Sequence, residues 1–270
     1  MTLLQALILG IVQGITEFLP ISSDGHLVLF ESFLGLKTEG LKAFDVVLHG
    51  GSLAAMVLYF RKDIWNLFQT TQRKMIGYIV LATLPAVVAG LTLEDWMDTT
   101  FRTTERTLGL MFLMGLFFFV AEGLAPRDKK ATFTLKNTFM IGLAQAMALL
   151  PGISRSGSTI AAGLLFGIKR EDAARFSFLL GMPAIGGAFV LKSWEAIQGE
   201  VLLPPANSVV MGFAASAIAG YISVSFLMKF LKTHSLRVFG VYLVVLSLVG
   251  MLGAVHIKEF VMANLQGVWI

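Results

Sequence analysis

Two polar segments interrupt an otherwise apolar sequence, and each holds residue types that can act on a phosphate. Residues 13–26 contain a glutamine, a glutamate, two serines, an aspartate and a histidine. Residues 151–159 contain one arginine among serines and glycines. The first set offers acids, a hydroxyl nucleophile and an imidazole, and the second offers donors for an anion. Together they indicate a site that binds a phosphorylated ligand and can hydrolyse it.

The first segment contains candidates for every role in a hydrolysis. Gln13 and Glu17 are four residues apart, so a helix presents both on one face. Glu17 could bind a hard cation such as Mg²⁺ or Ca²⁺, or act as a general base. Ser22 and Ser23 are candidate nucleophiles, and His26 can exchange a proton near neutral pH. A lone histidine at a helix start is more often structural, but its closeness to an acid and hydroxyls favours catalysis.

The second segment has the donors that a phosphate needs. Arg155 is the one basic residue in an apolar setting, where a charge is costly and usually functional. Gly152 and Gly157 let backbone N–H groups approach a ligand, and the apolar run that follows suggests a helix N-terminus. The alternative is a helix cap with Arg155 reaching to an interface. The hydroxyls that favour the anion site are those of Ser154, Ser156 and Thr159.

Composition places these segments in a membrane. Hydrophobic residues make up 56% of the 270 and charged residues 14%, whereas a soluble domain carries roughly 25% charge. Uncharged runs cover 76–93, 207–228 and 238–255, and a helical span needs roughly 20 residues. The net charge of +4 marks cytoplasmic loops rather than nucleic-acid binding. We expect an all-α integral membrane protein, with residues 1–270 as a single membrane domain.

The two halves of the chain resemble each other. Gly-Ile-Val-Gln at 10–13 corresponds to Gly-Leu-Ala-Gln at 142–145, and a proline and a Ser/Gly cluster follow each. Residues 44–48 correspond to 176–180 at the same offset of 132. We therefore predict two repeats, at about 1–125 and 135–260, with the functional site between them.

Each repeat is expected to begin with a broken apolar hairpin, followed by three spans. The hairpin arms are short and interrupted, and irregular backbone at membrane depth must be buried in protein or line a cavity, so both hairpins are predicted to be re-entrant. Three spans per half make the repeats inverted, with six transmembrane helices in total. The predicted arms are 3–18 with 27–34 and 137–150 with 156–168; the predicted spans are 43–60, 76–93, 107–124, 174–191, 207–228 and 238–255.

The loop charges give the orientation. Fourteen basic residues fall on one side of this topology and six on the other, with Arg155 on neither. The positive-inside rule then places both termini outside, with the first hairpin opening outward. The six on the outer side are Lys37, Lys42, Arg102, Arg106, Lys192 and Lys258.

The polar segments resemble the undecaprenyl-diphosphate phosphatase family, also known as bacitracin-resistance proteins. The resemblance rests on Glu17-Phe18-Leu19-Pro20-Ile21-Ser22-Ser23-x-Gly25-His26 and Pro151-Gly152-x-Ser154-Arg155-Ser156-Gly157-x-Thr159. Both motifs occur in order, about 130 residues apart, and the chain matches the family in length and layout.

The resemblance implies a metal-dependent hydrolase in the plasma (inner) membrane of a bacterium, with its active site facing the periplasm or cell exterior. It would convert undecaprenyl diphosphate to undecaprenyl phosphate and inorganic phosphate, recycling the lipid carrier for cell-wall synthesis and giving bacitracin resistance. The expected catalytic residues are Glu17, Ser23, His26 and Arg155. The expected substrate-binding residues are Ser22, Gly25, Ser154, Arg155, Ser156, Gly157 and Thr159, and the cation ligands are Gln13 and Glu17.

Several alternatives stay open. Asp24 stands where the family usually has threonine, and it could be a further metal ligand or a helix cap. Ser23 could attack phosphorus itself, or water could attack with Glu17 or His26 as base. The inverted-repeat plan also suits a polyprenyl-phosphate flippase or carrier, which would need no acid or imidazole. The partners expected are the lipid substrate and membrane lipids, and a homodimer is left open.

Overall fold

The computed structural model describes residues 1–36, 41–69, 73–126, 128, 130–199 and 203–266, and these are predominantly helical. Side-chain surroundings are described up to residue 253, apart from Glu94 and Asp98. Within these residues, the pairing of β type is one isolated bridge between Ala131 and Ile168. The prediction of an all-α fold is confirmed. Lys37 and the side chain of Lys258, used above for orientation, lie outside this description.

The described residues form eleven helices. They are α1 (Leu3–Phe18), α2 (Ser23–Phe33), α3 (Lys42–Tyr59), α4 (Arg61–Leu67), α5 (Arg73–Phe101), α6 (Thr104–Leu124), α7 (Leu135–Met147), α8 (Arg155–Leu165), α9 (Arg170–Ile197), α10 (Ala206–Phe230) and α11 (Arg237–Gln266).

Four of these helices are long and apolar enough to cross a membrane: α5 over Arg73–Leu93, α6, α9 and α10. Helices α3 and α4 form a fifth candidate, bent by 72° at their junction. Helix α1 and the Arg237–Gly253 part of α11 are shorter apolar helices. The chain is therefore a multi-pass membrane protein. Its described residues contain four or five spans by length and composition, fewer than the six predicted.

The short arms of both predicted hairpins are helices with tight turns between them. Helix α1 ends at Phe18, and α2 begins at Ser23, earlier than the predicted 27. In the second hairpin, α7 ends at Met147 and α8 begins at Arg155. The first turn of each second arm therefore contains the polar residues of its motif.

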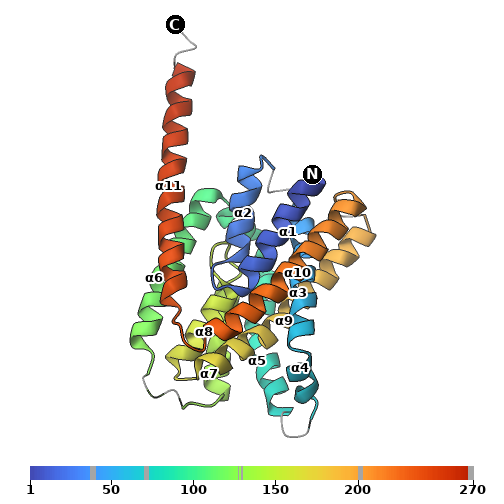
Figure 1. The fold of residues 1–270 in the computed structure, drawn as a ribbon, viewed down its shortest axis with the longest axis vertical. Coiled ribbons are helices and arrows are strands. Elements are labelled where there is room, and N and C mark those ends of the chain that lie inside the picture. Colours follow the sequence, from blue (N-terminus) through green and yellow to red (C-terminus); the bar gives the residue numbers. More distant parts are fainter. Residues whose placement is uncertain (37–40, 70–72, 127, 129, 200–202, 267–270) are drawn as a thin grey trace.

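Each hairpin packs against a long helix from the other half of the chain. Helix α1 lies along α10, α7 lies along α5, and α6 lies along α11 (Figure 1). Glycine permits this approach, since a Cβ at Gly10 would lie 2.5 Å from the Gly212 carbonyl oxygen. A Cβ at Gly142 would likewise lie 2.6 Å from the carbonyl oxygen of Ala82. The two halves are thus interlocked rather than side by side.

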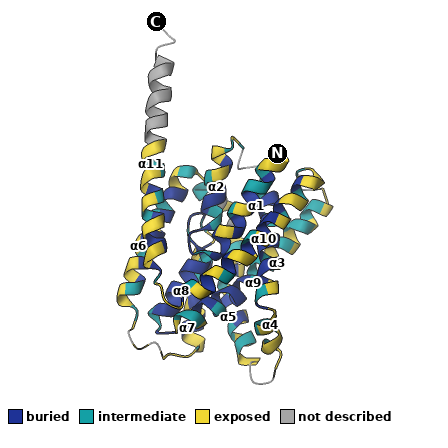
Figure 2. Cartoon of the chain, in the orientation of Figure 1, coloured by how far each residue is buried: buried dark blue, intermediate teal, exposed yellow. Residues whose placement is uncertain are grey.

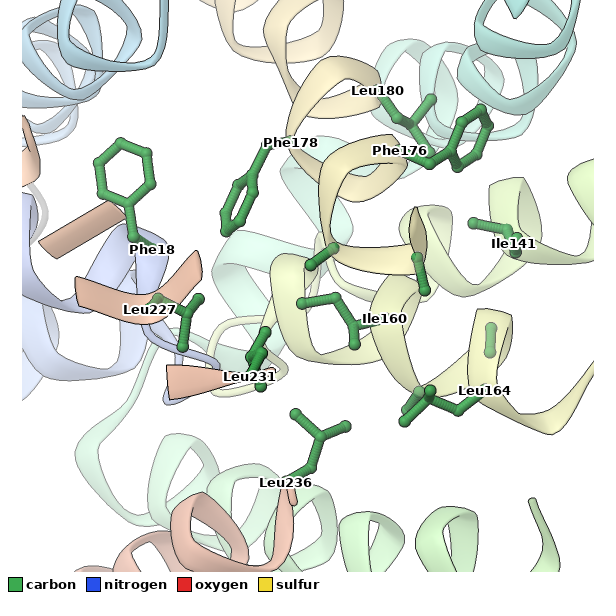
Figure 3. Packing of buried hydrophobic residues seen from close by; sticks show 14 of the residues in the cluster. Phe18, Ile141, Ile160, Leu164, Phe176, Phe178, Leu180, Leu227, Leu231 and Leu236 are labelled. Carbon is green, nitrogen blue, oxygen red and sulfur yellow. The ribbon is translucent and has the colours of Figure 1, made fainter. Parts of the chain in front are cut away.

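Burial follows the pattern of a membrane protein. Figure 2 shows buried residues around α2, α8 and the centre of the bundle, and exposed residues on its outside. Apolar side chains such as Val80, Leu84 and Leu91 are exposed, as expected for a lipid-facing helix. In the core, the rings of Phe18 and Phe178 lie 5.6 Å apart (Figure 3). This contact anchors α1 one residue after Glu17.

Candidate active site

Glu17 is the meeting point of the two hairpins. Its carboxylate is buried near the end of α1. Arg155 Nη2 donates to Glu17 Oε1 at 2.5 Å, across 138 residues of sequence. Ser23 Oγ and Gln13 Nε2 donate to Glu17 Oε2 at 2.7 Å and 3.1 Å. Three residues named from the sequence therefore bind directly to a fourth, Glu17.

The turn that presents Ser23 has an unusual backbone. Ser22 has φ of +70°, the one non-glycine residue with positive φ in the described chain. Such a conformation costs energy and tends to occur at functional sites. Ser22 Oγ accepts from Gly25 N at 3.3 Å and so caps α2. A Cβ at Gly25 would lie 2.8 Å from Met111 Sδ and 3.0 Å from Ser22 Oγ, so a larger residue there would crowd the cap and the Met111 side chain.

His49, on α3, joins the same site. Its Nδ1 donates to the Asp45 carbonyl oxygen at 2.8 Å, because a carbonyl can only accept. Its Nε2 lies 3.5 Å from Glu17 Oε2 and 3.5 Å from Asp24 Oδ1. Ser22, and not Asp24, caps α2. The carboxylate of Asp24 lies beside His49. The sequence offered no motif for His49 beyond its spacing from Asp45.

His26 is buried and lies between the first hairpin and α11. Its Nδ1 lies 2.8 Å from the Ser22 carbonyl oxygen and therefore carries the proton of the neutral ring. Nε2 is then an acceptor, and the hydroxyl of Tyr242 on α11 donates to it at 2.8 Å. The two rings stack with centroids 5.7 Å apart. Ser23 bonds to Glu17 rather than to His26, and sequence reasoning missed Tyr242.

Arg155 is the first residue of α8. Ser154 caps this helix by accepting from Gly157 N at 3.1 Å. Arg155 Nη1 donates to the carbonyl oxygen of Ser177 on α9 at 3.2 Å. Thr159 Oγ1 lies 2.6 Å from Ser177 Oγ, which ties α8 to α9.

The other expected phosphate-binding residues of α8 are also engaged within the protein. Ser156 and Thr159 are buried. A Cβ at Gly157 would lie 2.4 Å from the ring of Phe118. In this structure, Arg155 is the side chain of the second motif that reaches Glu17.

Four residues of the site remain partly accessible. The side chains of Asp24, His49 and Arg155 are 37%, 18% and 15% exposed, and Ser23 is also partly exposed. Glu17 and Gln13 lie beneath them, buried. A ligand that approaches these exposed side chains would meet a guanidinium, an imidazole, a carboxylate and the hydroxyl of the candidate nucleophile, Ser23.

A second charged group lies beside His49. Arg102 follows α5 and forms ion pairs with Asp45 and, at 3.6 Å, with Glu31. Burial opposes the charge of Arg102, but the two carboxylates outweigh this and raise its pKa. Glu31 is fully buried. Arg102, predicted to lie in an outer loop, therefore points into the protein.

Residues 6–249 match the family described as Bacitracin resistance protein BacA. The chain belongs to the bacitracin resistance protein BacA family. The chain is similar to an undecaprenyl-diphosphatase of Rubrobacter xylanophilus, 42% identical over 256 residues, which are 89% of this chain and 94% of that protein. An undecaprenyl-diphosphatase of Trichlorobacter lovleyi is 42% identical over 252 residues, 87% of this chain and 91% of that protein. Undecaprenyl-diphosphatase 4 of Bacillus thuringiensis subsp. konkukian is 43% identical over 244 residues, 90% of this chain and 93% of that protein. The family predicted from the two motifs is confirmed.

Proposed function

We propose that this protein hydrolyses undecaprenyl diphosphate to undecaprenyl phosphate and inorganic phosphate, recycling the lipid carrier and giving bacitracin resistance. The names of the relatives support the substrate. The observation that carries the proposal is Glu17 held between Ser23 at 2.7 Å and Arg155 at 2.5 Å. One carboxylate thereby links the candidate nucleophile to the candidate phosphate-binding cation.

In the favoured route, Ser23 Oγ attacks the terminal phosphorus. Glu17 accepts the proton of Ser23, to which it is already hydrogen-bonded. The bond from phosphorus to the bridging oxygen breaks, and undecaprenyl phosphate leaves. Water then attacks the phosphoserine: its oxygen binds phosphorus and its protons stay with the released inorganic phosphate, while the bond from phosphorus to the serine oxygen breaks and Glu17 returns its proton to that oxygen. Arg155 neutralises the charge of the diphosphate, which would compete with Glu17 for the guanidinium.

The second route uses the same residues with water as the nucleophile. Glu17 would take the proton of the water, and Ser23 would donate a hydrogen bond to the phosphate. Phosphoryl transfer depends mainly on positioning and charge stabilisation, so both routes need this geometry. In either route, His26 Nδ1 holds the Ser22 carbonyl, and with it the turn that presents Ser23, while the Tyr242 hydroxyl holds the His26 ring.

The donor set fits a hard divalent cation such as Mg²⁺ or Ca²⁺. Gln13 Oε1 is buried without a hydrogen-bond partner, beside Glu17. Together with the Asp24 carboxylate these residues offer only oxygen ligands, which such cations prefer. The described residues contain no group of three acidic, histidine or cysteine ligands, so substrate oxygens and water would complete the shell. Bound there, the cation would offset the repulsion between two carboxylates and a diphosphate.

An apolar groove beside the site suits the prenyl chain. It begins at Gly50, next to His49 in α3, and has a volume of about 510 Å³. Leu53 and Val57 of α3, Phe189 of α9 and Phe213 of α10 also line it, with Arg61 of α4. Because Gly50 directly follows His49 in the chain, we propose that a polyprenyl chain in this groove would have its diphosphate at the Gly50 end.

The test is phosphate release from undecaprenyl diphosphate by the purified protein in detergent. We expect release with Mg²⁺ or Ca²⁺, loss of release with a chelator, and recovery when the cation is restored. Measurable lipid transport without phosphate release under any divalent cation would favour the carrier instead. Full activity in chelator would overturn the metal requirement alone.

We also propose that the site faces the periplasm or cell exterior of the bacterial inner membrane. The distribution of basic residues supports this orientation. The chain has no native cysteine, so single cysteines at Lys130 and Asp98 can be labelled without background. An impermeant reagent should reach position 98 in intact cells and should not reach position 130. The opposite pattern would reverse the orientation.

A further inference from the structure

Gly181, on α9, lies directly against the guanidinium of Arg155. A Cβ at Gly181 would lie 2.0 Å from Arg155 Nη1, 2.4 Å from Cζ and 2.8 Å from Nη2. These separations are shorter than any contact between real atoms of these types. The guanidinium therefore occupies the space that a side chain at position 181 would fill.

The surroundings complete a seat for this side chain. Ser177 lies one helical turn before Gly181, and its carbonyl oxygen accepts from Arg155 Nη1 at 3.2 Å. Ser177 is itself fixed by the 2.6 Å contact of its hydroxyl with Thr159. Glu17 accepts from the other terminal nitrogen. The guanidinium is thus held on three sides, by a carbonyl, a carboxylate and the bare backbone of α9.

We infer that Gly181 is a positioning residue for phosphate binding, because its missing side chain lets Arg155 lie against α9 and point at Glu17. Any larger residue would push the guanidinium off α9 and so away from its position beside Glu17. This inference rests on the proposed function, in which Arg155 binds the diphosphate. It adds a requirement on α9 that neither motif contains.

The same geometry separates a functional effect from a folding effect. At Gly10 or Gly142, an added Cβ would meet backbone atoms of a neighbouring helix, so the fold would have to shift. At Gly181, it would meet the end of a flexible side chain that can move aside. Gly181 lies within α9 and has no positive φ, so alanine suits its backbone.

The test compares Gly181→Ala with Gly187→Ala, since a Cβ at Gly187 on the same helix would meet nothing within 4 Å. We expect both variants to be folded and monodisperse. Gly181→Ala should raise the KM for undecaprenyl diphosphate roughly tenfold or more, as expected when charge-assisted hydrogen bonds are misaligned. Gly187→Ala should behave as wild type. Gly181→Ser should be impaired at least as much as Gly181→Ala.

A binding measurement keeps the inference independent of turnover. Inorganic pyrophosphate should raise the melting temperature of wild type and Gly187→Ala, and should do so only at higher concentration for Gly181→Ala. Wild-type turnover with normal KM and normal pyrophosphate binding in Gly181→Ala would overturn the role of Gly181 and leave the proposed function standing. Weakened pyrophosphate binding in Gly181→Ala, with no hydrolysis by wild type, would support the seat and overturn the function. No binding and no hydrolysis by wild type would overturn both.

Discussion

The two helical hairpins share a construction but differ in chemistry. In each, a serine caps the second arm by accepting from the residue three positions on: Ser22 from Gly25, and Ser154 from Gly157. The first residue of that arm is Ser23 in one hairpin and Arg155 in the other, and both donate to Glu17. Equivalent positions 132 residues apart thus supply a candidate nucleophile and a candidate anion-binding cation.

The difference extends to the helices that follow. His49 on α3 and Gly181 on α9 are again 132 residues apart. His49 extends to Glu17, and Gly181 leaves room for Arg155. Position 49 therefore carries a side chain that reaches the site, whereas position 181 carries none and leaves room for Arg155. The direct link between Glu17 in the first hairpin and Arg155 in the second is thus a pair of opposite charges and not a pair of matching residues.

Backbone strain is also confined to one hairpin. Ser22 has φ of +70°, whereas the equivalent Ser154 has φ of −75°. The strained turn is the one that presents the candidate nucleophile. Its carbonyl is held by the His26 ring, so the strain has a local support.

The largest expected effect comes from removing the acid that the second hairpin lacks. Glu17→Ala should lower turnover by about 10²-fold or more, because it removes the proposed base and the partner of Arg155. Leu149→Ala, at the corresponding position 132 residues later, is the matched control and should retain activity. Phosphate release and protein folding should be measured for both. Similar losses in the two variants would break the proposed asymmetry.

Replacing the candidate nucleophile should have an effect of about the same size. Ser23→Ala should also lose about 10²-fold or more in turnover while still binding pyrophosphate, since Arg155 remains. Acid quenching of wild-type turnover should trap phosphate on Ser23 if the serine route operates. Substantial activity in Ser23→Ala would exclude that route and leave direct attack by water.

Phosphate binding by Arg155, in the second hairpin, is expected to depend on the planar shape of its guanidinium as well as on its charge. Arg155→Lys keeps the charge but loses the planar fork, so we expect a loss of roughly tenfold to a hundredfold in kcat/KM. Arg155→Ala, which removes the charge as well as the fork, should lose about 10²-fold in kcat/KM in a folded protein. Near-normal kinetics in Arg155→Lys would reduce the role of Arg155 to a simple charge.

The smallest expected effect comes from Tyr242, which supports His26 next to the strained turn. Tyr242→Phe removes the hydrogen bond to His26 but keeps the stacked ring, so turnover should fall by about fivefold, the scale of one net hydrogen bond. His26→Ala removes the whole ring and its Nδ1 hydrogen bond to the Ser22 carbonyl, leaving only the backbone N–H of residue 26 on that oxygen, and should lose about 10²-fold or more. Equal losses in both variants would show that Tyr242 does more than support the ring.

Much of the site could be predicted because its chemistry is local in sequence. Gln13 and Glu17 share a helix face, and Ser23 and His26 follow within ten residues. The membrane fold followed from composition, since long uncharged runs have few other stable states. The family was identifiable because both motifs are short and contiguous. In these respects the amino-acid sequence by itself was sufficient.

The remaining features depend on contacts between distant parts of the chain, which no local pattern encodes. Tyr242 reaches His26 across 216 residues. Arg102 is turned inward because Asp45 and Glu31 are buried beside it. Gly181 matters only through the guanidinium lying over it. The sequence determined which groups could act on a diphosphate, whereas helix packing decided which of them meet, because burial and distance are set by the whole bundle.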